Sequence, residues 1–285
     1  MFRIRKNFLP RKISDISAFF LLISAMPATY MFEIFIVFPT LYGSWTFQHW
    51  FHVIFGTFLM FQVTSNLIAL VMVDTSIKNE ILKMPDNKEK AKSWHFCACC
   101  ESAVPPRSWH CQICRTCILK RDHHCIFAGC CVGHKNHRFF CVFVIYMFVS
   151  TFYTTLHNII YFYSQVEFHK LVTLIKMICP LLMFILDNSL INIYIFLFDI
   201  NVFCLFFSLI MILYHSKIIL SGRVSHEYEK QKSNSTKYDL GWKKNLLVVF
   251  GKRWYLVFVS PFCHSELLMN GINWELFEEN SFKNK

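Results

Sequence analysis

Four long apolar stretches alternate with polar segments along this chain. The stretches run from Ile16 to Phe38, from Trp50 to Val73, from Phe139 to Tyr163 and from Ile191 to Leu213. Each stretch is long enough to cross about 30 Å of hydrocarbon as an α-helix. The pattern predicts an all-α polytopic membrane protein with four transmembrane helices.

Composition and charge support this fold and predict its orientation. Of the 285 residues, 55% are hydrophobic, and 29 lysines and arginines stand against 18 acids. Five of these basic residues precede the first stretch, eleven lie between Asp74 and Arg138, and eleven follow His215. The positive-inside rule therefore places both termini and the middle segment in the cytosol. This distribution favours membrane topology over nucleic-acid binding as the reason for the positive charge.

Five regions follow from this topology. They are a cytosolic amino-terminal segment (1–15), the first two transmembrane helices (16–73), a cytosolic cysteine-rich domain (74–138), the third and fourth transmembrane helices with a lumenal connection (139–215), and a cytosolic carboxyl-terminal region (216–285). The basic amino end precedes a long apolar run without a clear cleavage site, which favours an uncleaved signal anchor.

The connection between the third and fourth stretches leaves the number of spans open. Leu171 to Leu186 is nearly apolar, and as a fifth span it would make the carboxyl tail lumenal. We expect a lumenal or interfacial segment, because a fifth span would carry eleven basic side chains to the wrong face. The glycosylation triplet Asn234-Ser235-Thr236 is then cytosolic and is expected to stay unmodified.

Cysteines are concentrated in the middle segment. Nine of the thirteen lie between Cys97 and Cys131, and a reducing cytosol disfavours disulfides as the reason. The spacings Cys97-x-x-Cys100, Cys111-x-x-Cys114 and Cys114-x-x-Cys117 are typical of zinc binding. The segment has little apolar material for a core of its own, so metal binding is expected to supply its folding free energy.

The donor count exceeds the need of two zinc sites. Nine cysteines with His110, His123 and His124 offer twelve donors, and two closed tetrahedral sites take eight. Spacing alone leaves the four spare donors open. Adjacent His123 and His124 do not easily reach one ion, so one of them is spare. One of Cys97, Cys99 and Cys100 is also spare, as are some of Cys125, Cys130 and Cys131.

The run Asp122-His123-His124-Cys125 within this segment resembles the DHHC family of protein S-acyltransferases, or palmitoyltransferases. Further matches are Pro106-Arg107 before His110-Cys111, Cys131-Val132-Gly133, Asn136 with Phe140, and Tyr238-Asp239-Leu240-Gly241 with Asn245, Phe250 and Gly251. The ordered set extends from about Cys97 to Gly251, so it is far more specific than the four-residue motif alone.

The resemblance implies a role for each donor. Two structural Zn²⁺ ions would be bound by Cys97, Cys100, His110 and Cys117, and by Cys111, Cys114, His124 and Cys131. Cys125 would be the nucleophile, His123 its base and Asp122 the carboxylate that orients the imidazole. Ser225 would approach Asp122 in a supporting role, and Asn245 would brace the carboxyl-terminal region.

The implied activity is protein S-palmitoyl transfer. A long-chain acyl group would pass from palmitoyl-CoA to Cys125, and then to cysteines of membrane-associated protein substrates on the cytosolic side. The partners expected are acyl-CoA, such proteins and the lipid bilayer, with no nucleic acid. The family's common location, the endoplasmic reticulum or Golgi membrane, is expected here. Lys135 and Arg138 are candidates for binding the phosphates of coenzyme A. A simpler explanation is that they are basic residues flanking a span, as the positive-inside rule expects.

Several residues depart from the family pattern. Ile126-Phe127 replaces the usual Pro-Trp, Cys130 replaces an asparagine, and Val224 replaces the first threonine of a Thr-Thr-x-Glu motif. None of these changes removes a catalytic group. The main rival hypothesis is a catalytically inactive, membrane-tethered zinc-binding adaptor, which predicts zinc without acyl-enzyme. Cys130 and Cys99 are expected to have no role in metal binding or catalysis, or to be sites of off-pathway acylation or oxidation. Single histidines near span ends, such as His215, are expected to be interfacial side chains.

Overall fold

The computed structural model describes residues 3–78, 80–165, 175–176, 178–179, 189–230 and 238–274. Their contacts divide the chain into two compact units. Unit 1 takes in Met1–Phe19, Ser65–Val142 and Leu213–Lys285, and unit 2 takes in Phe20–Thr64 and Phe143–Ile212.

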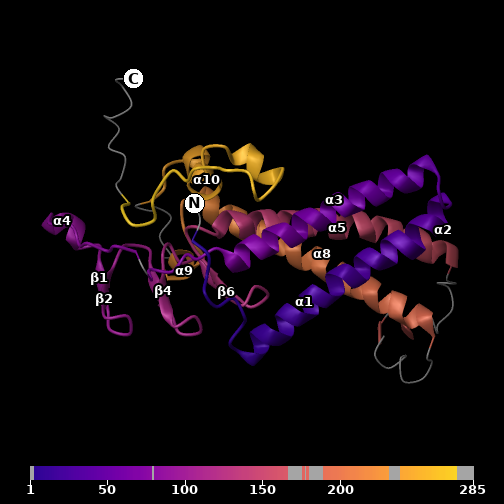
Figure 1. Ribbon diagram of the computed structural model, residues 1–285, viewed down its shortest axis with the longest axis horizontal. Helices are drawn as coiled ribbons and strands as arrows, with labels where there is room; N and C mark the ends of the chain where they lie inside the picture. Colours follow the sequence, from indigo (N-terminus) through magenta and orange to yellow (C-terminus); the bar gives the residue numbers. More distant parts are fainter. Residues whose placement is uncertain are drawn as a thin grey trace. The chain divides into compact units, whose positions relative to one another are not determined.

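Four long helices confirm the predicted membrane fold (Figure 1). Helix α1 (Ile13–Phe32) continues through a π-helical turn, η1 (Glu33–Val37), into α2 (Phe38–Tyr42), and the others are α3 (Phe47–Met72), α5 (His137–Gln165) and α8 (Leu190–Leu220). All four runs are long and apolar enough to cross a membrane. Each helical run begins one to three residues before the apolar stretch that predicted it, and all but α3, which ends at Met72, also extend beyond its end.

Unit 2 is a bundle of segments from these four helices. Most of the side chains in its core are aromatic. The core residues are Phe32, Val37, Phe38, Tyr161, Phe162, Ile195 and Phe198. A cavity of about 100 Å³ lies within this bundle and is lined mainly by apolar side chains from all four runs. Glu33 is buried beside it and accepts a hydrogen bond from Asn158 Nδ2 at 2.7 Å, which partly compensates a polar group inside an apolar bundle.

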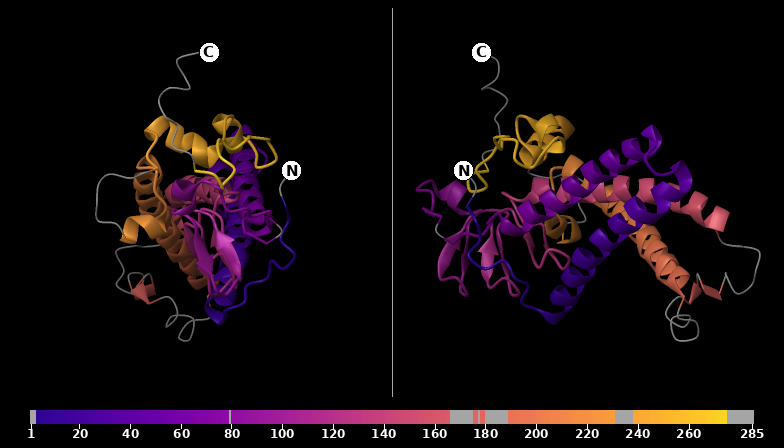
Figure 2. Two further views of the ribbon diagram at one scale, coloured as in Figure 1. Left: turned by 90° about the vertical axis from the view of Figure 1, so that its left-hand side faces the viewer. Right: turned by 45° about the vertical axis from the view of Figure 1, so that its right-hand side comes forward.

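Three short antiparallel hairpins form the cysteine-rich part of unit 1, gathered in one group in both views of Figure 2. Their strands are β1 (His95–Cys97) with β2 (Ser102–Val104), β3 (Trp109–Cys111) with β4 (Thr116–Ile118), and β5 (His123–Cys125) with β6 (Cys130–Val132). A short helix, α4 (Lys88–Ala91), precedes them. Strands of three residues cannot bury much apolar surface, so their pairing depends on what binds between them.

The segment after α3 connects the hairpins to the membrane helices. Thr75 accepts a backbone hydrogen bond from Leu119 at 3.0 Å, and Asp74 pairs with Arg3 at 2.6 Å. Asp74 Oδ1 also accepts from the backbone N–H of Ser76 at 2.8 Å, which fixes the turn. These contacts tie the amino-terminal segment and the hairpins to the end of α3.

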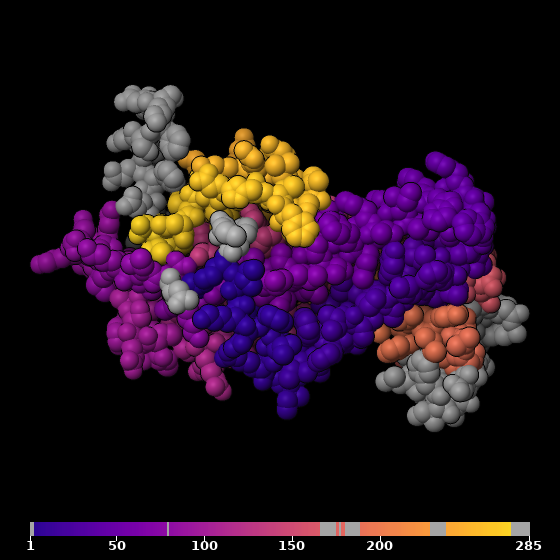
Figure 3. All heavy atoms as spheres, in the orientation of Figure 1, coloured from indigo at the N-terminus to yellow at the C-terminus, as the bar shows by residue number. Residues whose placement is uncertain are grey.

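The carboxyl-terminal residues cover part of unit 1. They form α9 (Ser225–Lys230), α10 (Trp242–Phe250) and a 3₁₀ turn, η2 (Trp254–Phe258). Figure 3 shows the last of these residues, in golden yellow, on the surface of this unit, near the indigo amino-terminal residues. Asn245 connects these elements, because its Nδ2 donates to the carbonyl of Leu220 (2.9 Å) and to the carboxylate of Asp239 (2.7 Å).

Two predictions lie largely outside the described residues. They concern the segment from Leu171 to Leu186 and the triplet Asn234-Ser235-Thr236. The predicted limits of the cytosolic and membrane regions also stay predictions, because contacts within a protein do not report where a bilayer lies.

Candidate active site and metal centres

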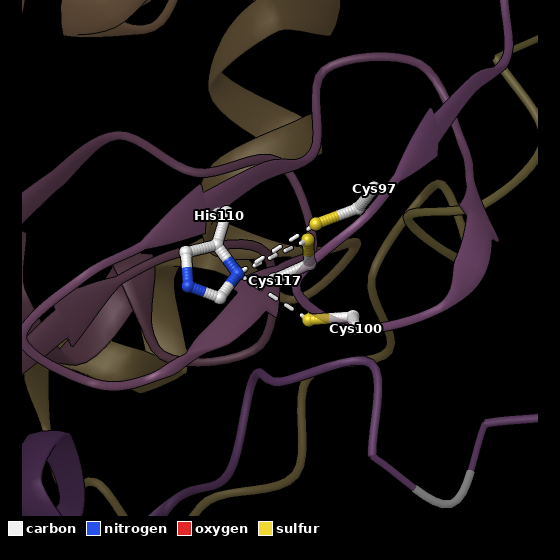
Figure 4. Close-up of side chains that lie close together, drawn as sticks. All are labelled: Cys97, Cys100, His110 and Cys117. Carbon is white, nitrogen blue, oxygen red and sulfur yellow. Dashed lines mark hydrogen bonds between the residues drawn. The ribbon is translucent and has the colours of Figure 1, made fainter.

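The first cysteine–histidine cluster joins two hairpins. Cys97 and Cys100 come from the β1–β2 hairpin, while His110 and Cys117 face each other across β3 and β4. Figure 4 shows the three sulfurs directed at the ring nitrogen of His110. The distances from His110 Nδ1 are 3.7 Å to Cys97, 3.3 Å to Cys100 and 3.9 Å to Cys117.

The second cluster repeats this plan one hairpin further along the chain. Cys111 and Cys114 lie at the turn between β3 and β4, and His124 faces Cys131 across β5 and β6. His124 Nδ1 lies 3.6, 3.4 and 3.6 Å from the sulfurs of Cys111, Cys114 and Cys131. The clusters are therefore interleaved, and together they link all three hairpins.

Both donor sets fit zinc. Within each cluster the four donor atoms lie within 4.8 Å of one another. A tetrahedral ion with Zn–S near 2.3 Å and Zn–N near 2.0 Å separates nitrogen from sulfur by about 3.5 Å, close to the distances above. Three thiolates and an imidazole are also the ligands that Zn²⁺ prefers, and four of them close the coordination shell. The structure thus brings together all eight residues predicted as ligands.

The β5–β6 hairpin separates the clustered Cys–His donors from the residues predicted as catalytic. Successive side chains of a strand point to opposite faces, and directly opposed residues share a face. The pairs His123↔Val132 and Cys125↔Cys130 therefore lie on one face, and the pair His124↔Cys131 lies on the other. Cys125 and His123 consequently share the face that carries no residue of the two Cys–His clusters. Strand pairing explains why adjacent histidines have different surroundings.

Asp122 is fully enclosed and holds His123. Its Oδ2 lies 2.6 Å from His123 Nδ1. Ser225, the first residue of α9, donates its backbone N–H to Oδ1 at 2.8 Å and its hydroxyl to Oδ2 at 2.9 Å. The side chain of Asp122 is 0% exposed, so these donors replace the water that a carboxylate would otherwise require.

Electrostatics favour the charged forms of this pair. Burial opposes ionisation of Asp122, but its hydrogen bond with His123 and the surrounding imidazoles hold its pKa below the usual range. Burial also disfavours the imidazolium of His123, yet the hydrogen bond with Asp122 and the neighbouring Cys125 raise the pKa of His123 to about 9. His123 therefore places a positive charge on the face of the hairpin that carries Cys125.

A second ion pair positions the residue that contacts Asp122. Arg107 Nε and Nη2 each donate to a different oxygen of Glu227, both at 2.8 Å. Glu227 Oε2 in turn accepts from the backbone N–H of Val224 at 3.1 Å. This bidentate pair holds the start of α9, and with it Ser225, beside the hairpins. Loss of the threonine hydroxyl at Val224 leaves these backbone contacts in place.

His215 is a neighbour of the site that the sequence did not predict. It was expected to be an interfacial side chain near a span end, but the structure buries it, with Nδ1 3.6 Å from Asp122 Oδ2. Its ring and that of His123 both meet Phe140 edge to face. In the sequence, the only sign of this role was a polar residue at the end of a largely apolar stretch.

Asp15 is the second residue that the sequence analysis missed. It lies in the first turn of α1, is 0% exposed, and its Oδ2 lies 3.0 Å from His124 Nε2. A carboxylate in this position orients the histidine and strengthens it as a metal ligand. With His124 Nδ1 facing the sulfurs, Nε2 is left to donate to Asp15.

The two basic residues considered for phosphate binding are already engaged. Arg138 is buried and donates from Nη1 to the carbonyl of Ser265 at 2.7 Å. Lys135 Nζ contacts Glu80 Oε1. Both partners are contributed by the fold itself, so a structural role explains these side chains better than phosphate recognition.

Comparison with known proteins adds the family context. A family model described as DHHC palmitoyltransferase matches residues 90–232. The chain is 29% identical over 231 residues to "Probable palmitoyltransferase ZDHHC24" from Danio rerio, covering 79% of this chain and 75% of that protein. The Homo sapiens protein of the same name is 30% identical over 229 residues, with 77% and 76% covered.

A plant protein is similar over a shorter region. "Probable protein S-acyltransferase 12" from Arabidopsis thaliana is 34% identical over 167 residues, covering 55% of this chain and 50% of that protein. The matched family region contains the three hairpins, α5, α8 and α9. These comparisons confirm the resemblance that the Asp-His-His-Cys run predicted.

Proposed function

Because the chain belongs to the DHHC palmitoyltransferase family, we propose that it is a protein S-acyltransferase that uses palmitoyl-CoA and forms an acyl-enzyme on Cys125. The observation that carries this proposal is the division of the β5–β6 hairpin. Cys125 and His123 share one face, His123 is bound to Asp122, and the eight clustered donors leave Cys125 unassigned.

The first step forms the acyl-enzyme. The Cys125 thiolate attacks the carbonyl carbon of the acyl-CoA thioester, and the bond to the coenzyme A sulfur breaks. His123 supplies the proton that leaves coenzyme A as a thiol. Asp122 keeps the imidazole in place, with Ser225 fixing the carboxylate through two hydrogen bonds.

The second step passes the acyl group to a protein. His123 accepts the proton of the acceptor cysteine, whose sulfur attacks the thioester on Cys125 and regenerates the free enzyme. Both steps exchange one thioester for another, so they are nearly balanced in free energy, and catalysis depends on positioning and thiolate activation. Bound zinc supplies only structure in this scheme, because four protein ligands leave it no open position.

The membrane fold suits the acyl donor. Transfer of a long acyl chain from water into hydrocarbon is favourable by about 0.8 kcal/mol per CH₂. The protein offers helices of membrane-spanning length together with an apolar cavity in unit 2. We propose membrane-associated proteins with cytosolic cysteines as acceptors, and the endoplasmic reticulum or Golgi membrane as the location.

The test is acyl-enzyme formation by the purified, zinc-loaded protein with radiolabelled palmitoyl-CoA. We expect hydroxylamine-labile label on the protein, its loss in Cys125→Ser and much slower labelling in His123→Ala. Cys99→Ser is the matched control, because Cys99 is exposed and belongs to neither metal cluster. Unchanged label in Cys125→Ser would reject the nucleophile, and zinc-loaded protein without any label would favour the inactive adaptor.

A further inference from the structure

A second thiol, that of Cys130, faces Cys125 across the β5–β6 hairpin. Cys125 ends β5, Cys130 begins β6, and the strand register makes them direct partners. Directly opposed residues of antiparallel strands have Cα atoms about 4.5–5.5 Å apart, within the range of about 4.4–6.8 Å found for disulfides. Since opposed side chains share a face, both thiols lie on the His123 side of the hairpin, away from His124 and Cys131.

Cys130 is a buried thiol outside the metal clusters. It belongs to none of the three groups of possible metal ligands in the described residues, and it is 1% exposed. Its sulfur lies 3.7 Å from the carbonyl oxygen of Leu70, a weak contact that a rotation about χ1 would release. The chain thus places a buried, unligated thiol beside the residue proposed as nucleophile.

The surroundings hold the two strands together. The hairpin turn contains Gly129, whose φ of +57° places it in the left-handed region that favours glycine. An added Cβ there would come within 2.6 Å of Pro10 Cγ, so the amino-terminal segment packs directly on the turn. A turn closed in this way keeps Cys125 and Cys130 opposite each other and limits the movement required to join them.

We propose that Cys125 and Cys130 are a dithiol modification site that peroxides convert into a reversible intramolecular disulfide. The Cys125 thiolate attacks one oxygen of hydrogen peroxide, which breaks the O–O bond, gives the sulfenic acid and releases hydroxide. The Cys130 sulfur then displaces the hydroxyl group of the sulfenic acid as water. In total two thiols lose two electrons and two protons, and one peroxide is reduced to two waters.

The disulfide has two consequences for the enzyme. It removes the nucleophile from the acyl-transfer cycle until a thiol reductant restores it, and it stops oxidation of Cys125 before the irreversible sulfinic and sulfonic acids. The first consequence rests on the proposed function, whereas the disulfide itself depends only on the hairpin.

Mass spectrometry of the full-length, zinc-loaded protein tests the linkage directly. Residues 122–135 form one tryptic peptide that contains Cys125, Cys130 and Cys131. After hydrogen peroxide treatment, denaturation with a chelator and N-ethylmaleimide, we expect this peptide to have lost two hydrogens and to carry a single maleimide, on Cys131. Dithiothreitol before alkylation should give three maleimides. A maleimide on Cys125 or Cys130 after peroxide, or a link that includes Cys131, would overturn the proposal.

Matched variants test whether the disulfide protects Cys125 from irreversible oxidation. In Cys130→Ser the serine keeps the size of the side chain, and peroxide should drive Cys125 to sulfinic and sulfonic acid, so that dithiothreitol no longer restores acyl-enzyme formation. Wild type and Cys99→Ser should recover fully. Equal recovery in Cys130→Ser, or loss of activity in step with zinc release, would contradict the proposal. If the reduced protein forms no acyl-enzyme at all, the proposed function fails, while the peptide masses still decide the disulfide.

Discussion

At the scale of single residues, Asp122 is the centre of the candidate site. It is enclosed by the protein and still binds His123 and Ser225 with three short contacts. A buried carboxylate that lost one of these donors would be left with unmet hydrogen-bonding capacity, and hydrogen bonds to charged groups contribute about 1.5–3 kcal/mol. The orientation of His123 therefore depends on residues from two distant parts of the chain.

Removal of the Ser225 hydroxyl tests this dependence. In Ser225→Ala we expect acyl-enzyme formation to slow about 10- to 100-fold, because the lost hydrogen bond to Asp122 is worth about 1.5–3 kcal/mol. Ser225→Thr keeps the oxygen and should stay near wild type. The measurement is the single-turnover labelling rate, with zinc content as a check on folding. Equal rates for the alanine and wild-type proteins would show that the backbone contact alone suffices.

The pH dependence of Cys125 reactivity tests the charge of His123. Wild-type His123, with its pKa raised to about 9, carries its proton through neutral pH. In Asp122→Asn the pKa should fall to its ordinary value of about 6.5 or below. Cys125 then loses its cationic neighbour between these two values, so its alkylation by iodoacetamide at pH 7.5 should slow about tenfold or more.

The matched control for this experiment is Asp86→Asn, which removes an exposed acid and should leave the profile unchanged. Alkylation is followed by mass spectrometry of the peptide 122–135 from pH 6 to pH 9.5. Superimposable profiles for Asp122→Asn and wild type would mean that Asp122 does not set the protonation of His123.

At the scale of elements, the hairpins are organised by what they bind. Each metal cluster combines a cross-strand Cys–His pair with two cysteines from the preceding hairpin, so neither cluster can form on one hairpin alone. Strands of three residues are too short for independent stability. Zinc binding and hairpin formation are therefore expected to be a single cooperative event.

Helix α1 contributes to the second cluster through Asp15. Because a carboxylate partner of a metal-bound histidine typically strengthens metal affinity 10- to 100-fold, Asp15→Asn should weaken zinc at the cluster of Cys111, Cys114, His124 and Cys131 by about that factor. The first cluster should be unaffected, since the described contacts of His110 Nδ1 are with Cys97, Cys100 and Cys117, and none of these residues belongs to α1. When zinc is transferred to a chromogenic chelator, each cluster should release its ion in a separate phase. In Asp15→Asn one of the two phases should be faster, and Asp86→Asn should behave as wild type.

The sequence predicted which residues gather into clusters but not how they are arranged. Two-residue spacings indicated zinc binding, and the family resemblance carried by the Asp-His-His-Cys run assigned the eight donors that the structure brings into two clusters. The three hairpins were not predicted, because segments this short carry no usable periodicity. Asp15 and His215 were missed for a different reason. Asp15 is 109 residues from His124 in the chain, and contacts at such separations leave no local pattern.

At the scale of the whole molecule, hydropathy was the most reliable guide. The hydrocarbon core of a bilayer offers no water to backbone polar groups, and a long apolar helix meets this condition by satisfying all of them within itself. All four predicted stretches are accordingly helical. Side-chain contacts inside the bundle, such as that of Glu33 with Asn158, are not fixed by this condition and could not be predicted.

Two exposed cysteines test the predicted topology. Cys99 belongs to the cysteine-rich region and Cys179 to the connection between α5 and α8, which the four-span topology places on opposite sides of the membrane. In cells whose plasma membrane alone is permeabilised, a membrane-impermeant maleimide should label Cys99 and not Cys179. Detergent that opens all membranes should expose both, with Cys99→Ser and Cys179→Ser identifying each signal. Asn234 should carry no glycan. A Cys179 that stays unlabelled in detergent-opened membranes, together with a glycan on Asn234, would instead mean that the segment from Leu171 to Leu186 spans the bilayer and carries the basic tail into the lumen.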